Sequence, residues 1–300
     1  MKKYVGILCG IVSAVSYGTN PLFGVPLLRV GYGVESMLFF RFLGAAVLLL
    51  PFAFYFGHGL RTTRSEAGVL FFVGVLFAVS SLALYESFKL MPAGIASAIL
   101  FLYPVFTALI MGVFFKAPIG WRATAAIAVS FCGILLLADL RGGSVSALGI
   151  GLVVLSALSY SMYMVALKVT RLADMSALKV AFYSLLFSAV AFAIYFAARA
   201  GLPQIPKNLS EFLCVAGLIV FPTLLSITSI AFAVRYAGPT ITAILGAFEP
   251  ASAAVFCALF LGEKFTAAIV SGIGLVVLSV ILLALPERKN LQNSRILRNS

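Results

Sequence analysis

The chain has 300 residues, of which 63% are hydrophobic and only 10% are charged. A soluble domain carries roughly 25% charged residues, so this composition, with its mean hydropathy of +1.15, indicates a membrane protein. The net charge of +12 does not indicate nucleic-acid binding, because the basic residues lie in short loops and the C-terminal tail and form no clustered patch. We therefore expect the lipid bilayer, and no nucleic acid, as a partner.

The apolar runs predict ten transmembrane helices. Each span needs about 20 apolar residues, and a backbone exposed to lipid must satisfy its own hydrogen bonds, which favours helices. The run from Tyr4 to Val25 follows two lysines but has no small-residue cleavage pattern, so we expect a retained first helix. The predicted spans are residues 4–25, 34–57, 67–88, 93–115, 121–138, 147–168, 176–198, 211–234, 238–261 and 266–285.

The loop charges predict the orientation. Fourteen Lys and Arg residues fall on the side of the N-terminus and the tail, and six fall on the other side. Since cytoplasmic loops are enriched in Lys and Arg, both termini are expected in the cytoplasm. The compact loops suggest the inner (plasma) membrane of a bacterium.

The sequence also repeats itself. At an offset of 143, Gly6–Tyr17 aligns with Gly149–Tyr160, and six of these twelve positions are identical. At an offset of 146, Leu102–Pro104 falls on Phe248–Pro250. Each half holds five spans, an odd number, so the halves form an inverted-topology repeat with a substrate site expected near the midplane between them. The predicted divisions are a first repeat (1–140), a linker (141–146), a second repeat (147–286) and a basic cytoplasmic tail (287–300).

Several motifs resemble one family. Arg41-Phe42, Tyr103-Pro104-Val105-Phe106, Glu249-Pro250 and Leu261-Gly262-Glu263 are similar to the EamA-like branch of the drug/metabolite transporter superfamily. The resemblance covers roughly residues 4 to 285. It implies ten helices, cytoplasmic termini and the export or exchange of small metabolites, such as amino acids or amphipathic compounds. One departure is that the first repeat has Phe115-Lys116-Ala117 where the second has Leu261-Gly262-Glu263, so the loop acid occurs once.

Glu249 is the first candidate site residue, because it lies near the middle of a predicted span. Charges at this depth are costly and usually face the interior of a bundle. The carboxylate can bind a proton or a substrate ammonium group; alternatively it serves a structural ion pair, or it is a protonated acid hydrogen-bonded between helices. Pro250 and its repeat counterpart Pro104 are candidate helix breaks, which free a backbone carbonyl at the same depth.

Arg41 lies about two turns into the second span. It can capture a substrate carboxylate, or it can reach the interface or pair with an acid structurally. Glu86 and Lys89 end the third span and suggest an interfacial ion pair. Asn20 and five tyrosines complete the candidate substrate-binding set, although each aromatic ring can equally be packing: Tyr17, Tyr85, Tyr103, Tyr160 and Tyr163.

These patterns predict a secondary transporter that moves a small organic metabolite, an amino acid or related solute, by alternating access, with export as the expected direction. Glu249 is the candidate for proton coupling. The alternatives are a polyspecific exporter of aromatic or amphipathic compounds and, less favoured, a non-transporting scaffold. We expect no enzyme, cofactor or metal, because the four cysteines and the single histidine form no cluster. The sequence leaves the oligomeric state open.

Overall fold

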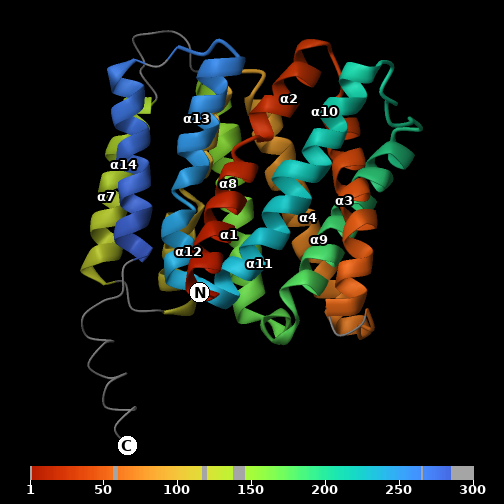
Figure 1. Ribbon diagram of the computed structural model, residues 1–300, viewed down its shortest axis with the longest axis horizontal. Coiled ribbons are helices and arrows are strands. Elements are labelled where there is room, and N and C mark those ends of the chain that lie inside the picture. The colour runs from red at the N-terminus through yellow and green to blue at the C-terminus, as the bar shows by residue number, and fades with distance from the viewer. Residues whose placement is uncertain (1, 57–59, 117–119, 138–145, 265, 285–300) are drawn as a thin grey trace, which may run out of the picture.

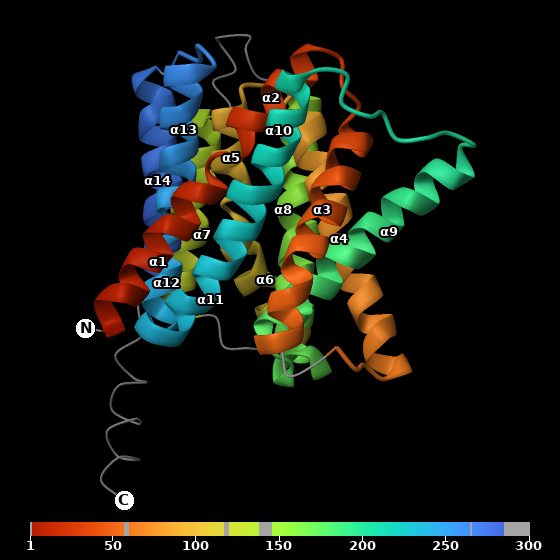
Figure 2. The same ribbon diagram turned by 45° about the vertical axis from the view of Figure 1, so that its right-hand side comes forward.

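The structure is a computed structural model that describes residues 2–56, 60–116, 120–137, 146–264 and 266–284. All regular secondary structure in these residues is helical, and the helices form one bundle (Figures 1 and 2). The first half contains α1 (Lys2–Tyr17), α2 (Asn20–Arg29), α3 (Val34–Phe56), α4 (Arg64–Ser87), α5 (Ala93–Leu100), α6 (Tyr103–Phe115) and α7 (Trp121–Leu137). The second half contains α8 (Ala147–Val169), the short η1 (Arg171–Asp174), α9 (Ala177–Ala198), α10 (Leu209–Ile219), the π-helical η2 (Val220–Leu225), α11 (Ser226–Ala237), α12 (Pro239–Leu245), α13 (Phe248–Phe260) and α14 (Ala267–Ala284).

The described helices are those of a multi-pass integral membrane protein. Seven helical segments are long and apolar enough to cross a bilayer, and three shorter apolar helices accompany them. The ten-span count therefore stays a prediction. The first segment continues through Pro26 to Arg29, beyond the predicted end at residue 25. Helical continuation past a proline is tolerated where neighbouring helices shield the backbone.

Three of the predicted spans contain a break in the helix. The breaks separate α1 from α2, α5 from α6 and α12 from α13. In each case a proline lies in the first turn of the following helix: Pro21, Pro104 and Pro250. Proline is accepted there because the N–H that it lacks has no partner within the helix.

The ends of the helices show the repeat in three dimensions. Thr63 caps α4 together with Glu66, and Asn208 caps α10 together with Glu211, an offset of 145. After α6 and α13, Lys116 (φ 52°) and Gly262 (φ 73°) both adopt the left-handed region, at an offset of 146. The difference of one residue matches the extra residue that a π-helical turn accommodates, and η2 lies between these two landmarks.

The bundle has two faces. The start of α1, η1 and the turn between α11 and α12 lie at one end, which we call the N-terminal face (Figure 1). The end of α2 and the connection between α13 and α14 lie at the other end, which we call the distal face (Figures 1 and 2). The halves interleave, because α1 packs on α11 and α4 packs on α8.

Gly18, in the break between α1 and α2, allows α13 to approach closely. A Cβ atom at Gly18 would lie 2.1 Å from Ser252 Oγ and 3.0 Å from the backbone N of Ala253. We expect Gly18→Ala to lower the free energy of unfolding by about 1–3 kcal/mol, because the backbone of α13 must shift to make room. Thermal or denaturant unfolding in detergent measures this change.

Gly68 provides the matched control, since it lies in α4 with open space around its Cα. Gly68→Ala should leave stability unchanged or raise it by about 1 kcal/mol, as alanine favours a helix over glycine. Equal effects of the two substitutions would contradict close packing at Gly18.

Candidate functional site

A cavity of about 460 Å³ lies between the two halves. Its lining includes Tyr17 and Tyr103 from the first half and Glu249 from the second. It also includes the exposed residues Ala173 and Ala177 beside η1, so the cavity reaches the surface at the N-terminal face. No described residue of the connections at the distal face lines it. Among the described residues, the cavity therefore reaches the N-terminal face and not the distal face.

Arg41 lines this cavity and is held by neutral partners. Its side chain is 2% exposed; Nε donates to Thr223 Oγ1 at 2.8 Å and Nη1 donates to the Tyr85 hydroxyl at 3.0 Å. Tyr85 in turn donates to Asn20 Oδ1 at 2.9 Å. Arg41 forms no ion pair within the described part of the chain. A buried guanidinium without a carboxylate partner, with N–H groups unused, is prepared to bind an anion.

Asn20 and Tyr85 lie one layer behind the cavity wall. Asn20 follows the α1–α2 break and donates from Nδ2 to the Tyr17 backbone carbonyl at 2.8 Å. Tyr85 is fully buried in α4, and its ring centroid lies 5.9 Å from Arg41 Cζ. Neither residue lines the cavity. Tyr85 holds Arg41 directly, and Asn20 holds Tyr85.

Thr223 is a site residue that the sequence analysis missed. It lies in η2, is 1% exposed, and donates its hydroxyl to the Leu218 carbonyl at 2.8 Å while it accepts from Arg41. π-helical turns occur frequently at functional sites, since they turn a side chain away from the regular helical position. Pro222 beside it was the one local signal, and threonine in an apolar helix gave no other.

An aromatic cluster forms another wall of the cavity. The Tyr103 and Tyr160 rings are perpendicular with centroids 4.7 Å apart, and the Tyr160 and Tyr163 rings are stacked at 5.5 Å. Phe77, which the sequence analysis also missed, packs on Tyr163 at 5.5 Å and lines the same cavity. Such a wall accepts planar apolar groups and can attract a cation over the ring faces.

Glu249 faces this cavity without a partner. No hydrogen bond or ion pair to its carboxylate is found among the described residues, where the one ion pair joins Lys89 and Glu86. Tyr17, Tyr103 and Tyr160 are within electrostatic reach of the carboxylate. Tyr17 is also within electrostatic reach of Arg41. Within the described part of the chain, the cavity thus presents one unpaired carboxyl group and one guanidinium group whose hydrogen-bond partners are neutral.

Six of the eight predicted substrate-binding residues line the cavity, and they include pairs related by the repeat. Tyr17 corresponds to Tyr160 at the offset of 143, and Tyr103 corresponds to Glu249 at the offset of 146. Arg41 corresponds to Ser184, a buried cavity-lining serine that the sequence analysis did not select. The repeat therefore contributes matched positions to one site, but it carries each charge on one half only. Pro104 and Pro250 lie outside the lining.

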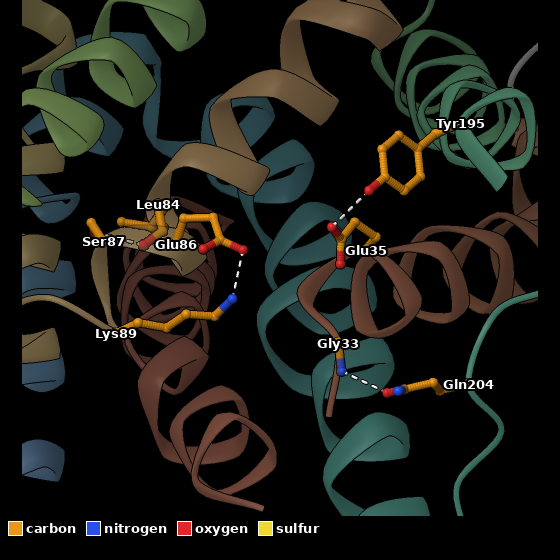
Figure 3. A network of polar contacts seen from close by, with 8 residues as sticks. All are labelled: Gly33, Glu35, Leu84, Glu86, Ser87, Lys89, Tyr195 and Gln204. Atoms are coloured by element: carbon orange, nitrogen blue, oxygen red, sulfur yellow. Dashed lines mark hydrogen bonds and ion pairs between the residues drawn. The ribbon is translucent and has the colours of Figure 1, made fainter. Parts of the chain in front are cut away.

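One set of polar contacts outside the cavity lies at the distal face (Figure 3). Lys89 Nζ lies 2.7 Å from Glu86 Oε1, which is the interfacial ion pair expected from the sequence, and Tyr195 donates to Glu35 at 3.1 Å. Both contacts are partly exposed, and exposed pairs contribute little to stability. Among the described residues no group of three or more His, Cys, Asp or Glu side chains is placed to hold a metal ion.

Two helical repeats around a solute-sized, charged cavity define the class of multi-pass membrane transporters. Within this class, the chain belongs to the EamA-like transporter family, which its sequence matches over residues 4–138 and 147–285.

Its relatives are named as transporters. The chain is 29% identical over 166 residues to the uncharacterized transporter YdfC of Bacillus subtilis (strain 168), a match covering 55% of this chain and 54% of the relative. It is 28% identical over 138 residues to an S-adenosylmethionine uptake transporter of Rickettsia bellii, covering 45% of this chain and 46% of the relative. The chain thus spans about half the length of the curated relatives it matches.

A solved crystal structure of a protein has the same fold. It aligns with a TM-score of 0.69 at 18% sequence identity, covering 95% of this chain and 97% of the solved one. At this identity the likeness describes the fold alone.

The Tyr85 hydroxyl is the support of Arg41 that can be removed most cleanly. Tyr85→Phe leaves Arg41 Nη1 and Asn20 Oδ1 without this partner, so we expect it to lower the free energy of unfolding by about 1–3 kcal/mol. Unfolding of the purified protein in nanodiscs or detergent measures the loss.

Tyr195→Phe is the control, because it removes a hydroxyl bonded to Glu35 at the edge of the bundle. It should change stability by less than about 0.5 kcal/mol. A Tyr85→Phe protein as stable as the Tyr195→Phe protein would contradict a supporting role for this hydroxyl.

Proposed function

We propose that this protein is a ten-helix secondary transporter of a bacterial inner membrane, with both termini in the cytoplasm, that moves a small zwitterionic solute by alternating access. The observation that carries the proposal is the presence of Arg41 and Glu249 in one cavity, contributed by opposite halves, with no charged partner among the residues that the structure describes. An α-amino acid bears a carboxylate and an ammonium group, which complement these two side chains. We propose export as the direction in a cell that produces the solute.

The names of the relatives suggest a particular zwitterion. S-adenosylmethionine carries a carboxylate, an amino group, a sulfonium cation and an adenine ring. Arg41 suits the carboxylate, Glu249 suits a cationic group, and the tyrosine wall suits the ring and the sulfonium. We therefore propose S-adenosylmethionine as a candidate substrate beside amino acids with aromatic or apolar side chains.

The second candidate function is a polyspecific exporter of aromatic or amphipathic compounds. It is favoured by the cluster of Phe77, Tyr103, Tyr160 and Tyr163, which offers broad apolar surface. Competition by solutes without a carboxylate or an amino group supports this alternative. Competition restricted to zwitterions supports the first proposal.

Counterflow in proteoliposomes tests the proposed carrier. We expect vesicles preloaded with an amino-acid mixture or with S-adenosylmethionine to accumulate the matching labelled solute. Glu249→Gln should reduce this uptake roughly 10- to 100-fold, because it removes a charge-assisted interaction with the cationic group. Glu86→Gln is the control, since Glu86 pairs with Lys89 at the distal face, and it should retain uptake.

Uptake that survives Glu249→Gln would place the binding site elsewhere. An absence of counterflow with every solute would favour the scaffold alternative.

A pH gradient tests whether Glu249 exchanges its solute for a proton. If it does, preloaded vesicles should lose solute faster when the medium is more acidic than the lumen, because a proton entering at Glu249 replaces the departing cation. A Glu249→Gln protein with residual transport should not respond. Equal rates with and without the gradient, at saturating solute, would contradict coupling and indicate facilitated diffusion.

A further inference from the structure

The distal face carries a polar contact between the two halves that the transport site does not use. The Glu263 carboxylate, in the α13–α14 connection, accepts the backbone N–H of Ala93 at 2.7 Å and that of Gly94 at 3.1 Å. Beside it, Arg29 Nη2 donates to the Leu261 carbonyl at 3.0 Å. Arg29, Ala93 and Gly94 belong to the first half, and Leu261 and Glu263 belong to the second. We call this set of contacts the distal latch.

The hydrogen bonds of the latch join a carboxylate to the N-terminus of a helix, which is a favourable site for an anion. The first N–H groups of a helix have no partner within it, and the positive end of the helix dipole favours an anion. Glu263 binds two such groups at the start of α5. Burial raises the pKa of Glu263 above its ordinary value, while the bonds from Gly94 and Ala93 and the charge of Arg29 oppose that rise. The contact therefore holds a carboxylate in a partly buried place at the junction of the halves.

The repeat shows that the N-terminal face lacks the same chemistry. At the offset of 146, established by Lys116 and Gly262, the counterpart of Glu263 is Ala117 and the counterpart of Ala93 is Pro239. Alanine has no carboxylate to accept a hydrogen bond, and proline has no N–H to donate one. These residues cannot reproduce the bond between Glu263 and Ala93.

The latch lies at the distal face, opposite the face at which the central cavity reaches the surface. The central cavity reaches the N-terminal face beside η1, whereas Glu263 and Arg29 line a separate cavity of about 390 Å³ at the distal face. In an alternating-access cycle this distal contact must open before the solute can pass. The second cavity gives water access to the carboxylate when α5 moves away.

We propose that Glu263, held at the start of α5 and supported by Arg29, is a one-sided latch of the transport cycle. It stabilises the state whose cavity is open at the N-terminal face, and it must break for the distal face to open. This inference rests on the proposed alternating-access function. Because Ala117 and Pro239, the repeat counterparts of Glu263 and Ala93, cannot form the same bond, the resting carrier favours the state open at the N-terminal face.

Two introduced cysteines report the opening of each face. Ala93 is 2% exposed at the distal face, and Ala173 is an exposed residue at the mouth of the central cavity. Ala93→Cys and Ala173→Cys are made separately in the full-length protein, and the alkylation rate of each site is followed by mass spectrometry with a water-soluble maleimide. Glu263→Ala and Glu263→Gln are then added to each.

We expect Glu263→Ala to raise the alkylation rate at position 93 about tenfold or more, the factor that follows from losing a charge-assisted hydrogen bond, and to lower the rate at position 173. Glu263→Gln should act in the same direction but less, because its amide keeps one acceptor oxygen. Glu86→Gln, on the same face but outside the latch, should change neither rate.

The mirror variant tests the argument from the repeat. Ala117→Glu combined with Pro239→Ala introduces a carboxylate and an N–H at the repeat positions of Glu263 and Ala93, so it should slow alkylation at position 173 and speed it at position 93. A rise at both positions in the Glu263 variants, which indicates loosening of the whole bundle, would overturn the latch, as would unchanged rates.

The transport proposal fails separately from the latch. Reciprocal changes in alkylation without counterflow would support the latch and contradict the proposed substrate. Counterflow without reciprocal changes would support the carrier and overturn the latch.

Discussion

The buried guanidinium of Arg41 is the constraint on which the arrangement of the central helices depends. A charge in an apolar bundle must be hydrogen-bonded or neutralised. Here the hydrogen bonds come from Tyr85 and Thr223, neutral groups on α4 and on η2, and Tyr85 is tied in turn to Asn20 at the α1–α2 break. Three separate segments are therefore held around one side chain. Because its hydrogen-bond partners are neutral, they do not neutralise its charge.

The irregular parts of the helices surround this region. The α1–α2 break supplies Asn20, the π-helical turn supplies Thr223, and Glu249 follows the α12–α13 break. Irregular backbone at membrane depth is tolerated where it is buried in protein or lines a cavity. The breaks therefore cluster where a solute site needs polar groups, while α4, α8 and α9, which have no such break, supply packing surfaces.

The sequence predicted the charged residues and the tyrosines of the site, but not Phe77, because charges and polar aromatic residues are conspicuous in apolar runs. Glu249 and Arg41 carry a charge at membrane depth, and Tyr17 and Tyr160 occupy matching places in the repeat. Their roles in binding stay predictions. Membership of the EamA-like family, inferred from short motifs, is confirmed by the match over both halves. The helix breaks were marked at Pro104 and Pro250, whereas the break after Tyr17 was not recognised as one.

Other residues were only weakly marked in the sequence, or not marked at all. Thr223 and Ser184 are ordinary residues in an apolar helix, and their importance comes from a π-helical turn and from packing of α9 that no local pattern reveals. Glu263 was noticed as a loop acid without a repeat counterpart, but its partners lie 169 and 170 positions away in the chain. Contacts of such separation depend on the tertiary arrangement, so a sequence pattern identifies one partner and not the pair.

Two kinds of asymmetry are imposed on one repeated framework, and they have different consequences. At the centre, the repeat counterpart of Arg41 is Ser184, and the repeat counterpart of Glu249 is Tyr103, so each charged side chain occurs in one half only. In the proposed function, we expect this difference to give a solute a preferred orientation in the cavity. At the faces, Glu263 binds α5, while Ala117 and Pro239 lack the atoms for such a bond. This difference favours one of the two states that an inverted repeat makes geometrically equivalent. Because the two properties depend on different sets of residues, we expect that the choice of solute and the balance between states can change independently.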